Sequence, residues 1–152
     1  MIQEYTRLAR PYFVLLLIVT VGRWLMGTAF GVPYDKGTNV LSIVTLTLFA
    51  SIFSTAFARR WLGWRVGQAA GFAMFMAVVS QLVILLLTAA SYGLGISSYF
   101  NAPMALNRQT ESIGFMGAMG FRVGGLVVNT ILNGIIGALG WALGGLLPAR
   151  EH

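Results

Sequence analysis

The sequence predicts an all-α integral membrane protein built as a bundle of four transmembrane helices. Hydrophobic residues make up 57% of the 152 residues and charged residues only 9%, whereas soluble domains contain about 25% charged residues. A soluble protein of this composition would expose wide apolar patches and aggregate. Four apolar stretches are long enough to span a bilayer, because roughly 20 helical residues cross its hydrocarbon core. One membrane domain over residues 1–152 accounts for the chain.

The four predicted spans cover residues 11–30, 39–58, 66–92 and 121–147. Each span must be helical, since in lipid every backbone N–H and C=O has to be paired within its own segment or in a closed barrel. The continuous apolar run from Val14 to Val19 lacks the alternation that a barrel strand needs. The third stretch exceeds the thickness of the bilayer, so we expect it to tilt.

The predicted connections differ in length. Residues 31–38 carry Pro33 and Gly37 in a turn signature, which joins the first two spans as antiparallel neighbours. Residues 59–65 (RRWLGWR) form a basic turn, and residues 93–120 form the one long connection. Within that connection we expect Asn101 to cap a short helix that has Pro103 in its first turn and runs to about Thr110.

The arginine and lysine residues predict the orientation in the membrane. One side of the predicted bundle carries most of them: Arg7, Arg10, Arg59, Arg60, Arg65 and Arg150. The other side has Lys36, Arg108 and Arg122. The positive-inside rule then places both termini in the cytoplasm, with a short first outer loop (31–38) and a long second outer loop (93–120). We expect the membrane to be the inner, or plasma, membrane of a prokaryote.

Composition argues against several classes of function. The net charge of +6 comes from short basic clusters between apolar runs, which is not the single basic face of a nucleic-acid-binding protein. The chain has no cysteine, and its one histidine is the terminal His152, so we expect neither a metal site nor a cofactor. No residue can serve as the base of a catalytic triad, and we therefore expect no enzyme.

Glycines mark one face of the fourth predicted span. Gly134, Gly137, Gly140 and Gly144 recur at steps of three and four residues, which places them on the same side of a helix. Glycine allows a neighbouring helix to approach closely in a membrane. The face can pack inside the bundle or against a second subunit, and the sequence leaves both alternatives open.

Polar residues inside the spans are the usual indicators of function in a membrane protein, because they are costly there. From their positions along the spans, one or two residues of each helix are predicted to meet in a polar layer: Arg23, Thr47, Gln81, Asn129 and Asn133. The layer is either packing, with Arg23 reaching the outer headgroups or pairing with Asp35 or Glu111, or a small site in which Arg23 holds an anionic group.

Two short segments resemble parts of the small four-helix fluoride channels. They are Val128-Asn129 with Gly134, and the run FSTAF at residues 53–57. In that family the asparagine helix precedes the phenylalanine-serine-threonine helix, whereas here it follows. The sequence therefore assigns no family.

Two functions remain as hypotheses. The first is an accessory or scaffold subunit of a membrane assembly, or a homo-oligomer, that works by helix packing and has the lipid bilayer and other membrane chains as partners. The alternative is a channel or carrier for a small anionic or neutral solute that passes the polar layer around Arg23. A third class, a lipid-modifying enzyme, would need residues of the long loop to supply its active site: Tyr99, Asn101, Arg108 and Glu111. Glu111 beside Arg108 is more typical of a solvated ion pair, which argues against this class.

Overall fold

The computed structural model describes residues 2–37, 41–107 and 111–148, which form seven helices and, within those ranges, no strand. Four helices are long and apolar enough to cross a membrane: α2 (Arg10–Thr28), α4 (Ile43–Leu62), α5 (Val66–Gly93) and α7 (Phe115–Gly144). The three short ones are α1 (Ile2–Leu8), α3 (Tyr34–Gly37) and α6 (Pro103–Asn107). The all-helical fold with four apolar spans is confirmed, and it indicates a membrane protein.

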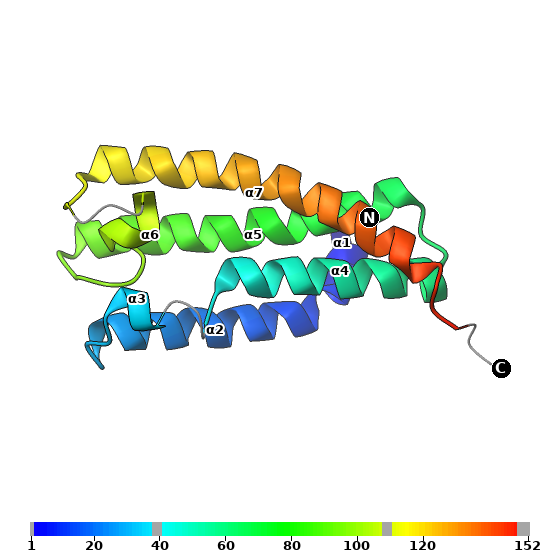
Figure 1. The fold of residues 1–152 in the computed structure, drawn as a ribbon, viewed down its shortest axis with the longest axis horizontal. Helices are drawn as coiled ribbons and strands as arrows, with labels where there is room; N and C mark the ends of the chain where they lie inside the picture. The colour runs from blue at the N-terminus through cyan, green and yellow to red at the C-terminus, as the bar shows by residue number, and fades with distance from the viewer. Residues whose placement is uncertain (1, 38–40, 108–110, 149–152) are drawn as a thin grey trace.

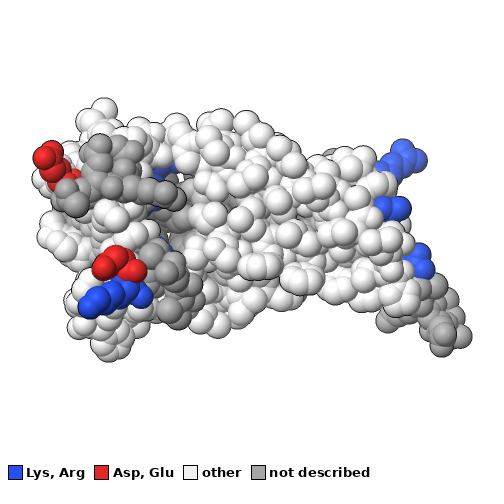
Figure 2. All heavy atoms as spheres, in the orientation of Figure 1, with Lys and Arg blue, Asp and Glu red and all other residues white. Residues whose placement is uncertain are grey.

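The four long helices lie side by side along the long axis of the molecule (Figure 1). Helix α7 packs against both α4 and α5, whereas α2 contacts mainly α4. We call the end that carries Arg59, Arg60 and Arg65 the basic end, and the end that carries α3 and α6 the loop end. Among the described residues on the visible face, Figure 2 shows acidic side chains at the loop end and not at the basic end.

Helix α4 lies four residues further along the chain than predicted. It begins after Ser42, whose Oγ accepts a hydrogen bond from the backbone N–H of Thr45 at 3.3 Å and so caps the helix. It ends at Gly63, which adopts the left-handed conformation (φ 66°) that favours glycine. The predicted start, Asn39, lies outside the described residues. By contrast, the observed bounds of α5 differ from the prediction by one residue.

Helix α7 begins at Phe115, six residues before the predicted start of the fourth membrane span at residue 121. The glycines between residues 114 and 125 are typical of a loop, yet tertiary contacts hold this segment in a helix. Tyr92 donates a hydrogen bond to the carbonyl of Ile113, and its ring packs edge-on against Phe115. At the other end, Arg59 donates to the carbonyls of Trp141 and Ala142, both at 3.0 Å, where the helix stops.

The long connection contains the short helix α6, which begins at Pro103 as predicted. The side chain of Asn101 does not cap it. Instead, its Oδ1 accepts from the backbone N–H of Ser98 at 2.8 Å, and its Nδ2 donates to the carbonyl of Ile96 at 2.9 Å. The predicted end at Thr110 and the charges of Arg108 and Arg150 lie outside the described residues.

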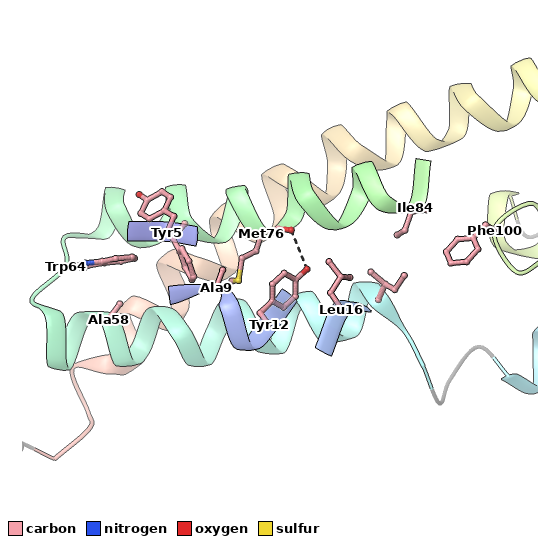
Figure 3. Close-up of a cluster of buried hydrophobic side chains, with 11 residues drawn as sticks. Tyr5, Ala9, Tyr12, Leu16, Ala58, Trp64, Met76, Ile84 and Phe100 are labelled. Carbon is pink, nitrogen blue, oxygen red and sulfur yellow. Dashed lines mark hydrogen bonds between the residues drawn. The ribbon is translucent and has the colours of Figure 1, made fainter. Parts of the chain in front are cut away.

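An aromatic cluster fastens the N-terminal helix α1 to the start of α5 (Figure 3). Tyr5 lies 5.5 Å from Trp64 and 5.4 Å from Phe72, measured between ring centroids. The Tyr5 hydroxyl donates to the carbonyl of Gln68 at 2.9 Å. Because α1 leads directly into α2, this cluster also holds the first span against the bundle at its basic end.

The first two glycines of the predicted face bring α7 against α5. A Cβ atom placed on Gly134 would lie 3.0 Å from Cγ of Met74, and one on Gly137 would lie 2.6 Å from Cβ of Ala73. Both distances are shorter than ordinary van der Waals contact, so a larger residue at either position would push the two helices apart.

The last two glycines bring the same helix against α4. A Cβ on Gly140 would lie 2.5 Å from the carbonyl oxygen of Ile52, and one on Gly144 would lie 2.9 Å from Cα of Ala56. All four glycines are buried. Within this chain their face is therefore covered by α4 and α5, and a second subunit would have to use another surface.

We predict that Gly140→Ala destabilises the protein, because the added methyl group overlaps the α4 backbone and overpacking costs about 1–3 kcal/mol. Gly120→Ala on the same helix is the matched control. Gly120 is exposed, and a Cβ at this position would have no neighbouring atom within 4 Å, so its substitution is expected to be neutral or slightly stabilising. Thermal unfolding in detergent measures both, and equal midpoints would contradict the packing assignment.

Candidate functional site

A cavity of about 120 Å³ lies at the loop end, where all four long helices and both short helices of that end contribute to its wall. Its lining includes one residue or more from each of these elements: Arg23, Tyr34, Ile43, Ile84, Ala105 and Arg122. Two of these side chains are guanidinium groups from different spans. The cavity therefore brings together Arg23, which is buried, and Arg122, which is partly buried.

Arg23 of α2 is only 8% exposed. Its Nη1 donates to the backbone carbonyl of Leu41 at 2.8 Å. Its Cζ lies 5.7 Å from the ring centroid of Tyr34 and 5.5 Å from that of Tyr99. Aromatic faces attract a cation and stabilise it where water is excluded, but they do not neutralise its charge.

Two glycines of α2 create the space for these contacts. A Cβ on Gly22 would lie 2.8 Å from Cδ1 of Leu41, and one on Gly27 would lie 2.8 Å from the backbone nitrogen of Tyr99. Gly27 follows Arg23 by one helical turn and so shares its face. The absence of a side chain at Gly27 lets the segment after α5 approach α2 and place the Tyr99 ring near the guanidinium group.

Arg122 of α7 connects three parts of the loop end. Its Nε donates to Oγ1 of Thr88 at 2.9 Å, and its Nη2 donates to the carbonyl of Phe100 at 2.6 Å. Its Nη1 lies 3.5 Å from the carbonyl of Ala105, which makes a weak contact. All three acceptors are uncharged, so these bonds orient the guanidinium group without balancing its positive charge.

Hydrogen bonds within the segment after α5 hold Tyr99 in place. The hydroxyls of Ser91 and Ser98 lie 2.7 Å apart, and the backbone N–H of Phe100 donates to Oγ of Ser98 at 3.1 Å. Tyr99 donates to the carbonyl of Val32 at 2.8 Å, which ties this segment to the end of α2. Burial raises the pKa of the Tyr99 phenol, so it is neutral at physiological pH and does not balance Arg23.

The electrostatic character of the cavity is positive. Its described lining contains no carboxylate. Asp35 and Glu111, which the sequence offered as partners of Arg23, are both exposed; Asp35 follows the lining residue Tyr34, and its charge acts on Tyr99, but no ion pair with Arg23 is found among the described residues. Ile43 and its neighbours in the lining belong to the N-terminus of α4, where backbone N–H groups lack intrahelical acceptors and carry partial positive charge. An anion would be stabilised here.

The other residues of the predicted polar layer do not line this cavity. Thr47 is buried nearer the middle of the bundle, where its Oγ1 lies 2.9 Å from the Tyr12 hydroxyl and donates to the carbonyl of Ile43 at 2.7 Å. The Tyr12 hydroxyl also lies 3.4 Å from the carbonyl oxygen of Met76, which is a longer and weaker contact (Figure 3). Tyr12 precedes Arg23 by about 16 Å of helix rise, so Thr47 and Arg23 lie at different depths.

Gln81, Asn129 and Asn133 form a second polar group between α5 and α7. Asn133 accepts a hydrogen bond at 2.8 Å from Oγ of Ser51, and its Nδ2 donates to the carbonyl of Asn129 at 2.9 Å. The side chains of Gln81 and Asn129 both approach the position that a Cβ would occupy on Gly125, at 3.8 and 4.0 Å. The Ser51–Asn133 hydrogen bond joins α4 to α7, whereas the Asn133–Asn129 bond lies within α7, and neither involves the two arginines.

Sequence reasoning missed Arg122 as a site residue because the predicted span began at residue 121, which placed this arginine at the membrane surface. Its true position is two turns inside α7. The signal that could have found it is the pairing of two arginines in apolar segments without any acidic residue in those segments. Tyr34 and Tyr99 carried no such signal, because only the fold brings their loops together.

Comparisons of the chain with models of protein families, with curated proteins and with solved structures find no match.

Proposed function

We propose that the protein is a carrier for a small anion, which binds in the cavity between Arg23 and Arg122. The observation that carries this proposal is the convergence of two guanidinium groups from α2 and α7 on one cavity without a carboxylate in its described lining. It corresponds to the second of the two hypotheses drawn from the sequence, with Arg122 in place of the rest of the polar layer.

The energetics of buried charge support an anionic ligand. Removing a cation from water costs several kcal/mol unless a counter-charge or hydrogen bonds compensate. Among the described residues, Arg23 donates one hydrogen bond, to a neutral carbonyl, and the acceptors of Arg122 are neutral as well. A bound anion would offset this cost for both groups at once, and charge-assisted hydrogen bonds to it are roughly twice as strong as neutral ones.

The interior between the cavity and the basic end supports a carrier rather than an open channel. Phe72 and Met76 are fully buried there, and Leu16 is 4% exposed. Solute can pass such packed side chains only if a helix moves. Helix α2 is the candidate for that movement, because it carries Arg23 and contacts the remaining long helices least.

The cavity is placed toward the outside in this proposal. The positive-inside rule puts the basic end and both termini in the cytoplasm, and the loop end with α3 and α6 on the outer side of a prokaryotic inner membrane. Arg23 then lies about 7 Å from the outer end of α2, within reach of a solute that enters from the outer surface.

A second function, an accessory subunit or homo-oligomer, is supported by a different surface. Four aromatic side chains follow the outer face of α4 at steps of four residues and are 40–57% exposed: Phe49, Phe53, Phe57 and Trp61. Phe57 and Trp61 stack with ring centroids 4.6 Å apart. Such an ordered aromatic face can pack against another membrane helix as well as against lipid.

Reconstituted protein is expected to take up at least one radiolabelled anion from a panel of chloride, phosphate and pyruvate, above the level of protein-free liposomes. Arg23→Gln should lower that uptake about tenfold or more, because it removes a charge-assisted hydrogen bond. Arg10→Gln is the matched control, since Arg10 is exposed at the basic end and its loss changes the net charge equally. Uptake of none of the anions, or equal uptake by Arg23→Gln and wild type, would refute the proposal.

The orientation can be tested by cysteine labelling, since the chain has no native cysteine. Leu62→Cys and Met104→Cys introduce thiols at exposed positions of the two ends. An impermeant maleimide added to intact cells should label residue 104 and should reach residue 62 only after permeabilisation. Labelling of both residues from one side would contradict the topology.

Native mass spectrometry from a gentle detergent tests the second function. If the aromatic face of α4 is an interface, the protein is expected to be extracted as an oligomer or as a complex with another chain. Phe53→Ala should then shift the distribution of oligomeric states toward the monomer. Val128→Ala on the exposed face of α7 serves as control. A monodisperse monomer whose mass distribution is unchanged in Phe53→Ala would contradict the interface and would indicate that the aromatic face of α4 contacts lipid only.

A further inference from the structure

The cavity at the loop end combines a cationic wall with an apolar one. Arg23 and Arg122 supply the positive charge, whereas Ile84, Phe100 and Ala105 line it with apolar surface. We infer that the ligand is a short-chain carboxylate, bound with its carboxylate at the two guanidinium groups and its hydrocarbon tail against the apolar residues. This inference rests on the proposed anion site and names the class of anion.

The size of the cavity sets the length of the tail. An engineered cavity of about 150 Å³ in another protein accommodates one benzene molecule. The cavity here, about 120 Å³, is slightly smaller. It therefore accommodates roughly five or six non-hydrogen atoms of a ligand, the size of propionate or butyrate, and because the cavity is open on one side, the end of a longer chain such as hexanoate would extend beyond its apolar wall.

The donors available match a carboxylate head. The guanidinium group presents five N–H donors in a planar fork that fits the two oxygens of a carboxylate. Arg23 uses one of its donors toward Leu41. Its remaining N–H groups face a cavity whose described lining offers no carboxylate, so a ligand oxygen would be their charged acceptor. Burial of Arg23 at 8% exposure strengthens such a bond, because water competes weakly.

The apolar wall disfavours fully polar anions. Phosphate carries oxygens in all four directions, and those that point toward Ile84 and Phe100 would lose their water without gaining a donor. Ile84 is 6% exposed and Phe100 is 2% exposed, so neither leaves room for a complete hydration shell. A chloride ion would satisfy the arginines but would leave the apolar wall uncovered by ligand.

Calorimetric titration of the full-length protein in detergent tests the inference with a series of sodium salts: acetate, propionate, butyrate, hexanoate, chloride and phosphate. Affinity is expected to rise about fourfold for each added methylene until the apolar wall is covered, and then to level off for hexanoate. Propionate or butyrate should bind about tenfold more tightly than chloride or phosphate, since only the carboxylates cover the apolar wall.

Ile84→Ala is expected to enlarge the cavity and raise the affinity for hexanoate relative to propionate by about tenfold or more. Ile84→Val provides a milder enlargement with the same direction of change if the alanine variant unfolds. Val79→Ala is the matched control, because Val79 lines a separate apolar groove between α2 and α5 and should leave the chain-length preference unchanged.

The outcomes separate the two proposals. Tightest binding of phosphate or chloride that is lost in Arg23→Gln would overturn the carboxylate inference and would leave the anion site standing. Affinities that do not depend on chain length, or that do not respond to enlargement at Ile84, would also overturn it. Binding of none of the six anions would refute the anion site itself.

Discussion

Buried polar groups in this bundle have to find their partners among the helices, because the outer surface of the long helices is apolar and offers no water. Thr47, Thr55 and Thr88 each donate to a backbone carbonyl one turn earlier in their own helix. Ser51 and Asn133 pair across α4 and α7. In lipid such groups would cost several kcal/mol each if they were left unpaired. The three threonines are thus satisfied within their own helices, and the Ser51–Asn133 bond links α4 to α7, whereas the buried hydroxyls of Thr20 and Thr130 have no hydrogen-bond partner among the described residues.

The need of buried polar groups for partners within the protein also distinguishes the cavity at the loop end. Serines, threonines and amides are satisfied by neutral partners, whereas a guanidinium group also carries a charge that neutral partners do not balance. Arg23 and Arg122 are held by carbonyls, a hydroxyl and aromatic rings, and they line a cavity that has space for a small ligand. The loop end thus differs chemically from the groove between α2 and α5, whose lining is apolar apart from Thr20.

Close packing and movement have to coexist if the protein is a carrier. The glycines of α7 fix that helix tightly against α4 and α5, and these three helices form the rigid part of the bundle. Helix α2 contacts this unit less, through Tyr12 near its start and Arg23 near its end. Besides these two hydrogen bonds, each of which contributes about 1 kcal/mol net, the buried side chains of Tyr12 and Leu16 and the aromatic cluster of Tyr5 hold α2 at its basic end, so a movement of α2 would begin at the loop end, around Arg23.

The sequence by itself determined the helical class, the four spans and the glycine face, because hydrophobic length and helical periodicity depend only on residues near one another in the chain. It also singled out Arg23. The start of α7 at Phe115, the role of Arg122 and the position of Tyr99 were decided by the tertiary structure alone. They depend on contacts such as Tyr92 with Ile113 and Tyr99 with Val32, between segments far apart in sequence. Local pattern carries no information about which distant carbonyl a hydroxyl or guanidinium group will reach.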